Sequence, residues 1–98
     1  MVGRVCAFVN PTMPGSIKIV ATNRNPEERL REANSSPWLD TKFSIAWVVG
    51  VDDAFAVKRR IFAAFAEHRT NQSRDFFCVT PEEALMVLST DLRAREGA

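Results

Sequence analysis

Apolar side chains in the first half of the chain follow the two-residue period of β-strands. Residues 5–9 are apolar at every position, which predicts a strand buried on both faces, and residues 17–21 predict a second short strand. The link between them, residues 10–15, contains two prolines and is too short for a crossover, so the two strands should form an antiparallel hairpin. Residues 43–51 predict the clearest strand, with the odd-numbered side chains on one face.

Two helix starts carry the same signal, a capping residue followed by Pro-Glu-Glu. In residues 25–28 the asparagine caps the helix, the proline suits its first position and the glutamates complement the helix dipole. This helix should end near residues 34–37. Residues 80–83 (Thr-Pro-Glu-Glu) repeat the pattern for a C-terminal helix, whose tail, residues 93–98, we expect to fray.

The 3.6-residue period predicts a helix between these two, capped by Asp52 or Asp53 and extending to about Glu67. One stripe of this helix forms its predicted core face: Val57, Ile61, Ala64 and Phe65. A second stripe lies beside the first: Phe55, Lys58 and Phe62. The helix should therefore pack its first stripe on the sheet.

The order of these elements is β-β-α-β-α-(β)-α, where the bracketed strand is a short extended segment at residues 75–79. This order predicts an α/β (α+β) fold in which a three-stranded antiparallel sheet is flanked by helices. Ninety-eight residues are enough for one modest core, so we expect residues 1–98 to form a single domain.

Composition narrows the class of protein. The chain is 46% hydrophobic and 26% charged, as in soluble globular proteins, and no apolar run approaches the ~20 residues of a membrane span. The N-terminus does not resemble a signal peptide, so we expect a cytoplasmic protein without membrane association. Cys6 and Cys78 lie far apart with no Cys-x-x-Cys spacing, which argues against a zinc site or a redox pair and favours two buried thiols.

A net charge of +1 indicates no class of partner, but the basic residues are unevenly distributed. They form three local groups: Arg24, Arg29 and Arg31; Lys58, Arg59 and Arg60; and Arg69 and Arg74. Such groups are ordinarily solvated helix faces, but they are also compatible with one basic face on a nearly neutral protein.

Three sequence blocks occur in the order and spacing of a known family. They are Asn-Pro-Thr-Met-Pro-Gly at residues 10–15, Asn-Pro-Glu-Glu-Arg-Leu-Arg-Glu at residues 25–32 and Arg-Asp-Phe-Phe at residues 74–77. With these blocks, residues 3 to about 88 resemble the GIY-YIG endonuclease superfamily, in particular its small phage-type branch, often described as DNA-binding. The resemblance implies a small α/β domain, in agreement with the element order above.

The resemblance also implies a chemistry. Active members cut phosphodiesters with one metal ion held by a glutamate, while two tyrosines and an arginine surround the attacking water and the scissile phosphate. The metal ion neutralises developing charge, the arginine stabilises it, and a tyrosine hydroxyl passes or orients a proton.

Little of that chemistry is present in this chain, which has no tyrosine. Cys6 and Lys18 align with the two tyrosines, and Val20 aligns with a glycine that permits close backbone approach. Arg29 matches the arginine of the helix, for which the resemblance implies a phosphate contact. The alternative for Arg29 is an ion pair with Glu32 in the same helix.

The metal site is the largest departure. Lys58 aligns with the metal-binding glutamate and Phe62 with a frequent histidine. An ammonium removes an oxygen ligand and repels a divalent cation, so this exchange argues against metal binding. Asp75 falls where the phage-type branch has a glutamate and is the candidate metal ligand that remains.

We therefore interpret the chain as a catalytically degenerate GIY-YIG-like domain that binds nucleic acid weakly, without sequence preference and without a cofactor. The candidate contacts are basic: Arg29, Arg31, Lys58, Arg59, Arg60 and Arg74. The first alternative is a protein-interaction or accessory module of a phage or mobile element. Its support is a set of apolar side chains around the old site: Phe8, Val20, Phe55 and Phe62. The second alternative is a divergent active endonuclease that holds Mg²⁺ on Asp75.

Overall fold

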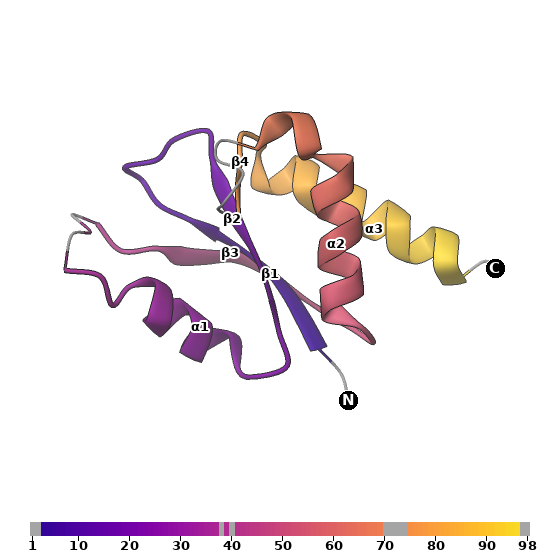
Figure 1. Ribbon diagram of the computed structural model, residues 1–98, viewed down its shortest axis with the longest axis horizontal. Coiled ribbons are helices and arrows are strands. Elements are labelled where there is room, and N and C mark those ends of the chain that lie inside the picture. Colours follow the sequence, from indigo (N-terminus) through magenta and orange to yellow (C-terminus); the bar gives the residue numbers. More distant parts are fainter. Residues whose placement is uncertain (1–2, 38, 40, 70–74, 97–98) are drawn as a thin grey trace.

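The computed structural model describes residues 3–37, 39, 41–69 and 75–96 and has an α+β fold (Figure 1). Its elements are β1 (Gly3–Val9), β2 (Ile17–Thr22), α1 (Pro26–Ala33), β3 (Ser44–Val51), α2 (Ala54–Ala64), the 3-10 turn η1 (Ala66–His68), β4 (Phe76–Phe77) and α3 (Pro81–Glu96). The predicted fold class and element order are confirmed, and the bracketed segment is a strand, so the sheet has four strands rather than three. Helix α3 continues past residue 93, where the sequence placed a frayed tail, and ends at Glu96.

The sheet is antiparallel throughout, with strand order β3-β1-β2-β4. β1 and β2 form the predicted hairpin, in which Cys6 pairs with Val20. Met13 N donates a hydrogen bond to Asn10 O (2.9 Å) in the turn, and Gly15 has a φ of 80°, a value that favours glycine. β4 pairs only with the start of β2, so the rest of that strand lies at the edge of the sheet.

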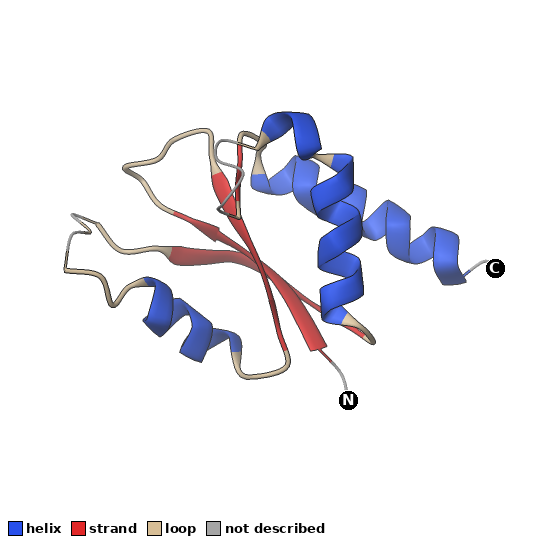
Figure 2. Cartoon of the chain, in the orientation of Figure 1, coloured by secondary structure: helices blue, strands red, loops and turns tan. Residues whose placement is uncertain are grey.

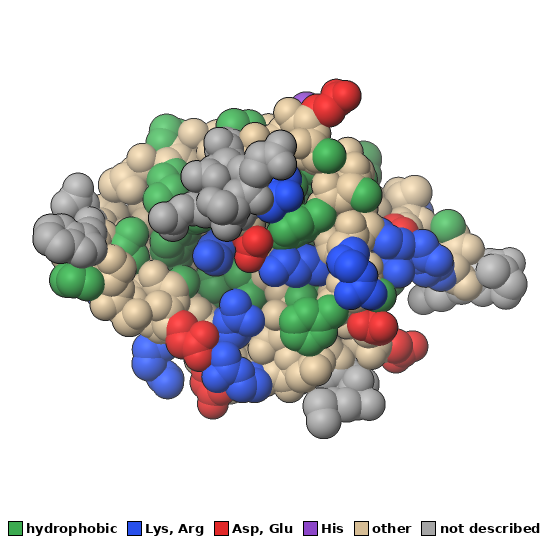
Figure 3. Space-filling model, in the orientation of Figure 1, with side chains coloured by type: hydrophobic (Ala, Val, Ile, Leu, Met, Phe, Trp, Pro, Cys, Tyr) green, Lys and Arg blue, Asp and Glu red, His purple; other side chains and the backbone are tan. Residues whose placement is uncertain are grey.

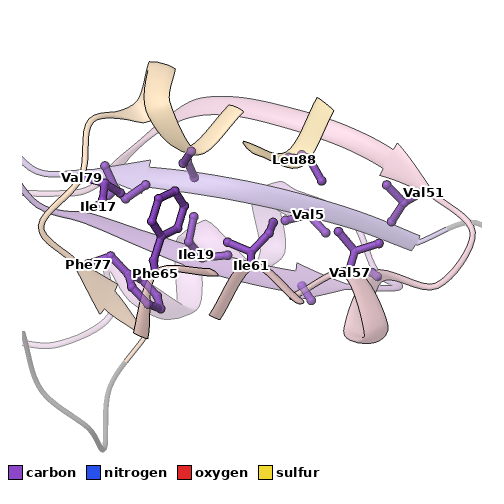
Figure 4. Close-up of a cluster of buried hydrophobic side chains, with 14 residues drawn as sticks. Val5, Ile17, Ile19, Val51, Val57, Ile61, Phe65, Phe77, Val79 and Leu88 are labelled. Atoms are coloured by element: carbon purple, nitrogen blue, oxygen red, sulfur yellow. The ribbon is translucent and has the colours of Figure 1, made fainter. Parts of the chain in front are cut away.

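Helices cover both faces of the sheet, with α1 on one side and α2 and α3 on the other (Figure 2). The larger core lies between the sheet and α2 and α3, and its buried side chains include Val5, Ile19, Val57, Ile61 and Leu88 (Figure 4). The smaller core lies under α1 and contains Cys6, Phe8, Val20 and Phe43. β1 contributes to both cores, as its uninterrupted apolar sequence predicts.

A β-bulge in β3 divides the single apolar face that was predicted for this strand. Trp47 pairs with Ala7 and Ile45 with Phe8, so Ala46 is an extra residue relative to β1. The extra residue reverses which side chains point to each face of the sheet. Trp47 therefore packs against the larger core and Ile45 against the smaller one, and the prediction of one shared face is wrong.

The polar helix starts confirm the predicted caps. The side chains of Asn25, Asp53 and Thr80 each accept a hydrogen bond from the first turn of α1, α2 and α3, at 3.0–3.1 Å. No helix in the described part of the chain is long and apolar enough to cross a membrane.

Two predictions of burial are wrong. Ala64 is exposed: α2 ends at this residue rather than near Glu67, and its buried side chains are Ala54, Val57 and Ile61. Cys78 is also exposed, because Phe77 and Val79 on either side of it point into the larger core and an extended chain alternates its side chains.

Candidate nucleic-acid interface

Four of the residues that the family resemblance singles out lie at the β2 edge of the sheet, between α1 and α2: Lys18, Arg29, Lys58 and Asp75. Just before β4, the carbonyl oxygen of Asp75 accepts a hydrogen bond from Ile19 N (3.0 Å). Further along the edge, α1 contributes Arg29 and α2 contributes Lys58. Figure 3 shows Lys and Arg side chains gathered across the middle of this face of the molecule, with acidic side chains among them.

Lys58 forms an ion pair with Asp75. Its Nζ lies 3.0 Å from Asp75 Oδ2, and both side chains are more than half buried, with 22% and 33% exposed. The Nζ also lies 5.1 Å from the centre of the Phe62 ring, within the range of a cation–π contact. The ammonium thus neutralises the one carboxylate that the sequence offered as a metal ligand.

These residues do not fit a divalent cation. Mg²⁺ requires oxygen ligands, and here Asp75 already binds a cationic side chain. No group of three or more His, Cys, Asp or Glu side chains suited to a metal ion occurs among the described residues. What these residues can offer a ligand is therefore positive charge held in fixed positions.

Arg69 is a basic residue of this region to which the sequence assigned no role. Its Cζ lies 5.1 Å from the ring centre of Phe62 and 5.8 Å from that of Phe77. The two rings contact each other edge to face at 4.8 Å. Phe62 therefore lies against the core and carries two cations, Lys58 and Arg69. The turn η1 after α2 and a β-bridge between Arg69 and Phe77 bring Arg69 here, so no local sequence signal marks it.

Arg29 is held on the edge of the sheet by two contacts. Its Nη1 donates a hydrogen bond to the carbonyl oxygen of Ala21 in β2 (3.1 Å), and its Nε lies 3.3 Å from Glu32 Oε2. Glu32 also binds Arg24, at 2.7 Å. The guanidinium is therefore fixed in place, and an acidic side chain occupies one of its donors.

A groove of about 200 Å³ lies beside Arg29; we call it the Arg29 groove. It is lined by Phe8, Lys18, Val20, Arg29, Glu32 and Ala33. Lys18 lies in it with its Nζ 5.2 Å from the ring centre of Phe76. Of the two residues at tyrosine positions, Lys18 thus reaches the groove.

Cys6, at the other tyrosine position, lies inside the smaller core and is fully buried. Burial raises the pKa of its thiol above the ordinary value, against the opposing effect of the Arg29 and Arg4 charges. A protonated thiol without access to solvent is suited neither to nucleophilic attack nor to passing a proton to a bound ligand.

Of the remaining basic candidates, Arg60 and Arg31 do not join Lys58 and Arg29. Arg60 lies on the other side of α2, where its Nε bonds both carboxylate oxygens of Asp91 in α3 (2.9 and 3.0 Å). Arg31 is exposed two residues from Arg29, on the opposite side of α1. Arg59 is exposed next to Lys58 on α2.

Arg74, the last basic candidate, lies outside the described residues.

The apolar patch proposed for a protein partner is not formed by its four residues. Phe8 and Val20 are buried under α1, Phe62 packs against the larger core, and Phe55 alone of the four is strongly exposed, at 47%.

Comparison with models of known protein families matches residues 3–90 to the T5orf172 domain. No curated protein and no solved structure matches the chain.

Proposed function

Since the chain belongs to the T5orf172 domain family, which is related to GIY-YIG nuclease-like domains, we propose that it binds nucleic acid at the β2 edge without cutting it. The binding surface comprises the Arg29 groove, the neighbouring Lys58 and Arg69, and the exposed Arg59 on α2.

One observation carries this proposal, the contact of 3.0 Å between Lys58 and Asp75. The resemblance implies that active relatives keep a carboxylate and a metal ion at the Lys58 position, facing the scissile phosphate. An ammonium there retains positive charge for a phosphate but supplies no ligand for a metal ion. This site therefore supplies positive charge that attracts a phosphate but no metal ligand that would help to cleave it.

The partners of the basic residues favour weak binding. Lys58 and Arg29 each contact a carboxylate, so a phosphate gains less from them than from unpaired cations. Contacts with the phosphate backbone position a ligand but do not read its bases, so the surface should accept most sequences alike.

A protein partner is the second candidate. It is favoured by strongly exposed apolar side chains: Phe55 on α2 (47%), Val48 on β3 (42%) and Met86 on α3 (70%). They lie on different elements, and β3 is at the opposite edge of the sheet from β4.

A divergent endonuclease is the third candidate and would require Asp75 to leave Lys58 and bind Mg²⁺.

The direct test compares Lys58→Gln with Arg60→Gln in binding to a fluorescent DNA duplex at low salt. Both changes remove one positive charge from α2, but only Lys58 lies at the β2 edge. We expect Lys58→Gln to weaken binding about three- to tenfold, because it also leaves Asp75 unneutralised. Arg60→Gln should change the affinity less than twofold.

Two results would contradict the proposal. Equal affinities of both variants and the unchanged protein would remove the β2 edge from the interface. Nicking of plasmid DNA with Mg²⁺ or Mn²⁺, abolished by Asp75→Ala, would establish the third candidate instead.

A further inference from the structure

A larger pocket of about 480 Å³ adjoins the Arg29 groove, between the β1–β2 turn, the end of α1 and β4. Its lining is mostly apolar, with polar atoms at three positions; the residues are Met13, Ser16, Lys18, Ala33, Ser36, Leu39, Phe43 and Phe76. The two phenylalanine rings lie 6.0 Å apart between centres, at an angle of 38°. Pockets of roughly 300–1,000 Å³ with such linings hold small planar molecules in many proteins.

The pocket and the Arg29 groove are neighbours. Lys18 and Ala33 line both of them, so the Lys18 side chain lies at their junction. Its ammonium lies 5.2 Å above the Phe76 ring in the pocket, and the Arg29 guanidinium lies in the groove. An aromatic cavity therefore opens directly beside two cations.

This pairing matches the two halves of a nucleotide. A base is planar and largely apolar on its faces, and it stacks on aromatic side chains, whereas its phosphate is anionic. We propose that the pocket takes one unpaired base of the bound nucleic acid while the adjoining phosphate lies on Lys18 and Arg29. This inference rests on the proposed function and specifies its ligand class as single strands or duplexes with an unpaired nucleotide.

A continuous duplex cannot fill the pocket, because its bases are stacked inside the helix. Extruding a base from a duplex costs a few kcal/mol, and this cost is least for a base that is already unpaired. The pocket should therefore favour nucleic acid with an unpaired base over a continuous duplex, even though the groove should bind most sequences alike.

The test uses the unchanged protein and three fluorescent DNA probes of equal length. The first is a continuous duplex, the second carries one unpaired nucleotide, and the third carries an abasic residue at that unpaired position. We expect the second probe to bind at least about fivefold more tightly than the first, the lower end of what base–aromatic stacking provides. The third probe should lose this gain, because it keeps the distorted backbone but lacks the base.

A pair of neighbouring substitutions locates the effect. Ser36→Phe places a ring at the rim of the pocket, whereas Ser35→Phe adds the same ring on the side of Arg31 and Lys42. Ser36→Phe should abolish the preference for the unpaired base and keep duplex affinity, and Ser35→Phe should keep both. Thermal unfolding of each variant confirms that it is folded.

The outcomes separate this inference from the proposed function. Equal binding of all three probes, or equal binding of the second and third, overturns the base pocket and leaves binding at the β2 edge intact. No binding of any probe at low salt overturns both.

Discussion

At the scale of single residues, two cations of the β2 edge are each held by a carboxylate. Arg29 lies against Glu32 and Lys58 against Asp75. These contacts fix the geometry of the positive charges before any ligand arrives, and they also compete with a phosphate. The sequence identified Arg29 by family resemblance and offered Glu32 as its partner through the three-residue spacing on one helix. It related Asp75 and Lys58 to the same candidate metal site but did not predict their ion pair, because 17 residues separate them.

The competition predicts that removing an acid strengthens binding. Glu32→Gln releases Arg29 Nε from its partner, so affinity for duplex DNA at low salt should rise about two- to fivefold, the scale of an exposed ion pair. Glu27→Gln is the matched control, since it makes the same charge change on the first turn of the same helix. Fluorescence anisotropy measures both. An equal rise in the two variants would mean that net charge acts alone and that Arg29 has no special place.

At the scale of elements, features set by neighbouring residues in the sequence were predicted correctly, whereas features set by contacts between elements were not. The proline-rich turn and the capped helix starts act within a few residues, and the structure confirms them. The bulge at Ala46 depends on how β3 meets β1, and the two-residue period of β3 alone does not reveal it. The 3.6-residue period of α2 likewise did not reveal that Ala64 is exposed.

Helix α2 offers a test of whether the position that corresponds to the catalytic site of nuclease relatives is part of the core. Ile61 is almost fully buried, so Ile61→Ala should lower the free energy of unfolding by about 2–5 kcal/mol. Phe62 is half-buried and contacts Phe77 edge to face, so Phe62→Ala should cost less, about 1–2 kcal/mol. Urea denaturation of the two variants measures the difference. Equal large losses would show that Phe62 has joined the core and that the cleft is filled at this point.

At the scale of the whole molecule, the arrangement of the charged side chains indicates more about a binding partner than the net charge does. Thirteen basic and twelve acidic residues nearly cancel. The fold nevertheless brings Lys18, Arg29 and Lys58 to one edge of the sheet, from three elements. It turns Arg60 toward α3 instead, although Arg60 lies two residues from Lys58. The basic residues 58–60 are adjacent in the sequence but do not all lie on one surface, because neighbouring positions of a helix point in different directions.

The salt dependence of binding tests this arrangement as a whole. Each duplex phosphate that the protein neutralises contributes a slope of about −0.9 to the logarithmic plot of affinity against salt. We expect a shallow slope equivalent to a few contacts, since few cations converge and most of them have acidic partners. Arg29→Ala should weaken binding to all sequences alike and make the slope about one unit shallower.

Arg31→Ala provides the control, because it removes the same charge from the opposite side of α1, where the side chain is exposed. If Arg29 meets a phosphate, the two variants must differ in slope as well as in affinity. Thermal unfolding has to show that Arg29→Ala is folded, since it also loses the hydrogen bond to Ala21 O. A folded Arg29→Ala variant that behaves like Arg31→Ala would place the nucleic acid elsewhere on the protein. Without any binding by the unchanged protein, a protein partner becomes the better explanation of this fold.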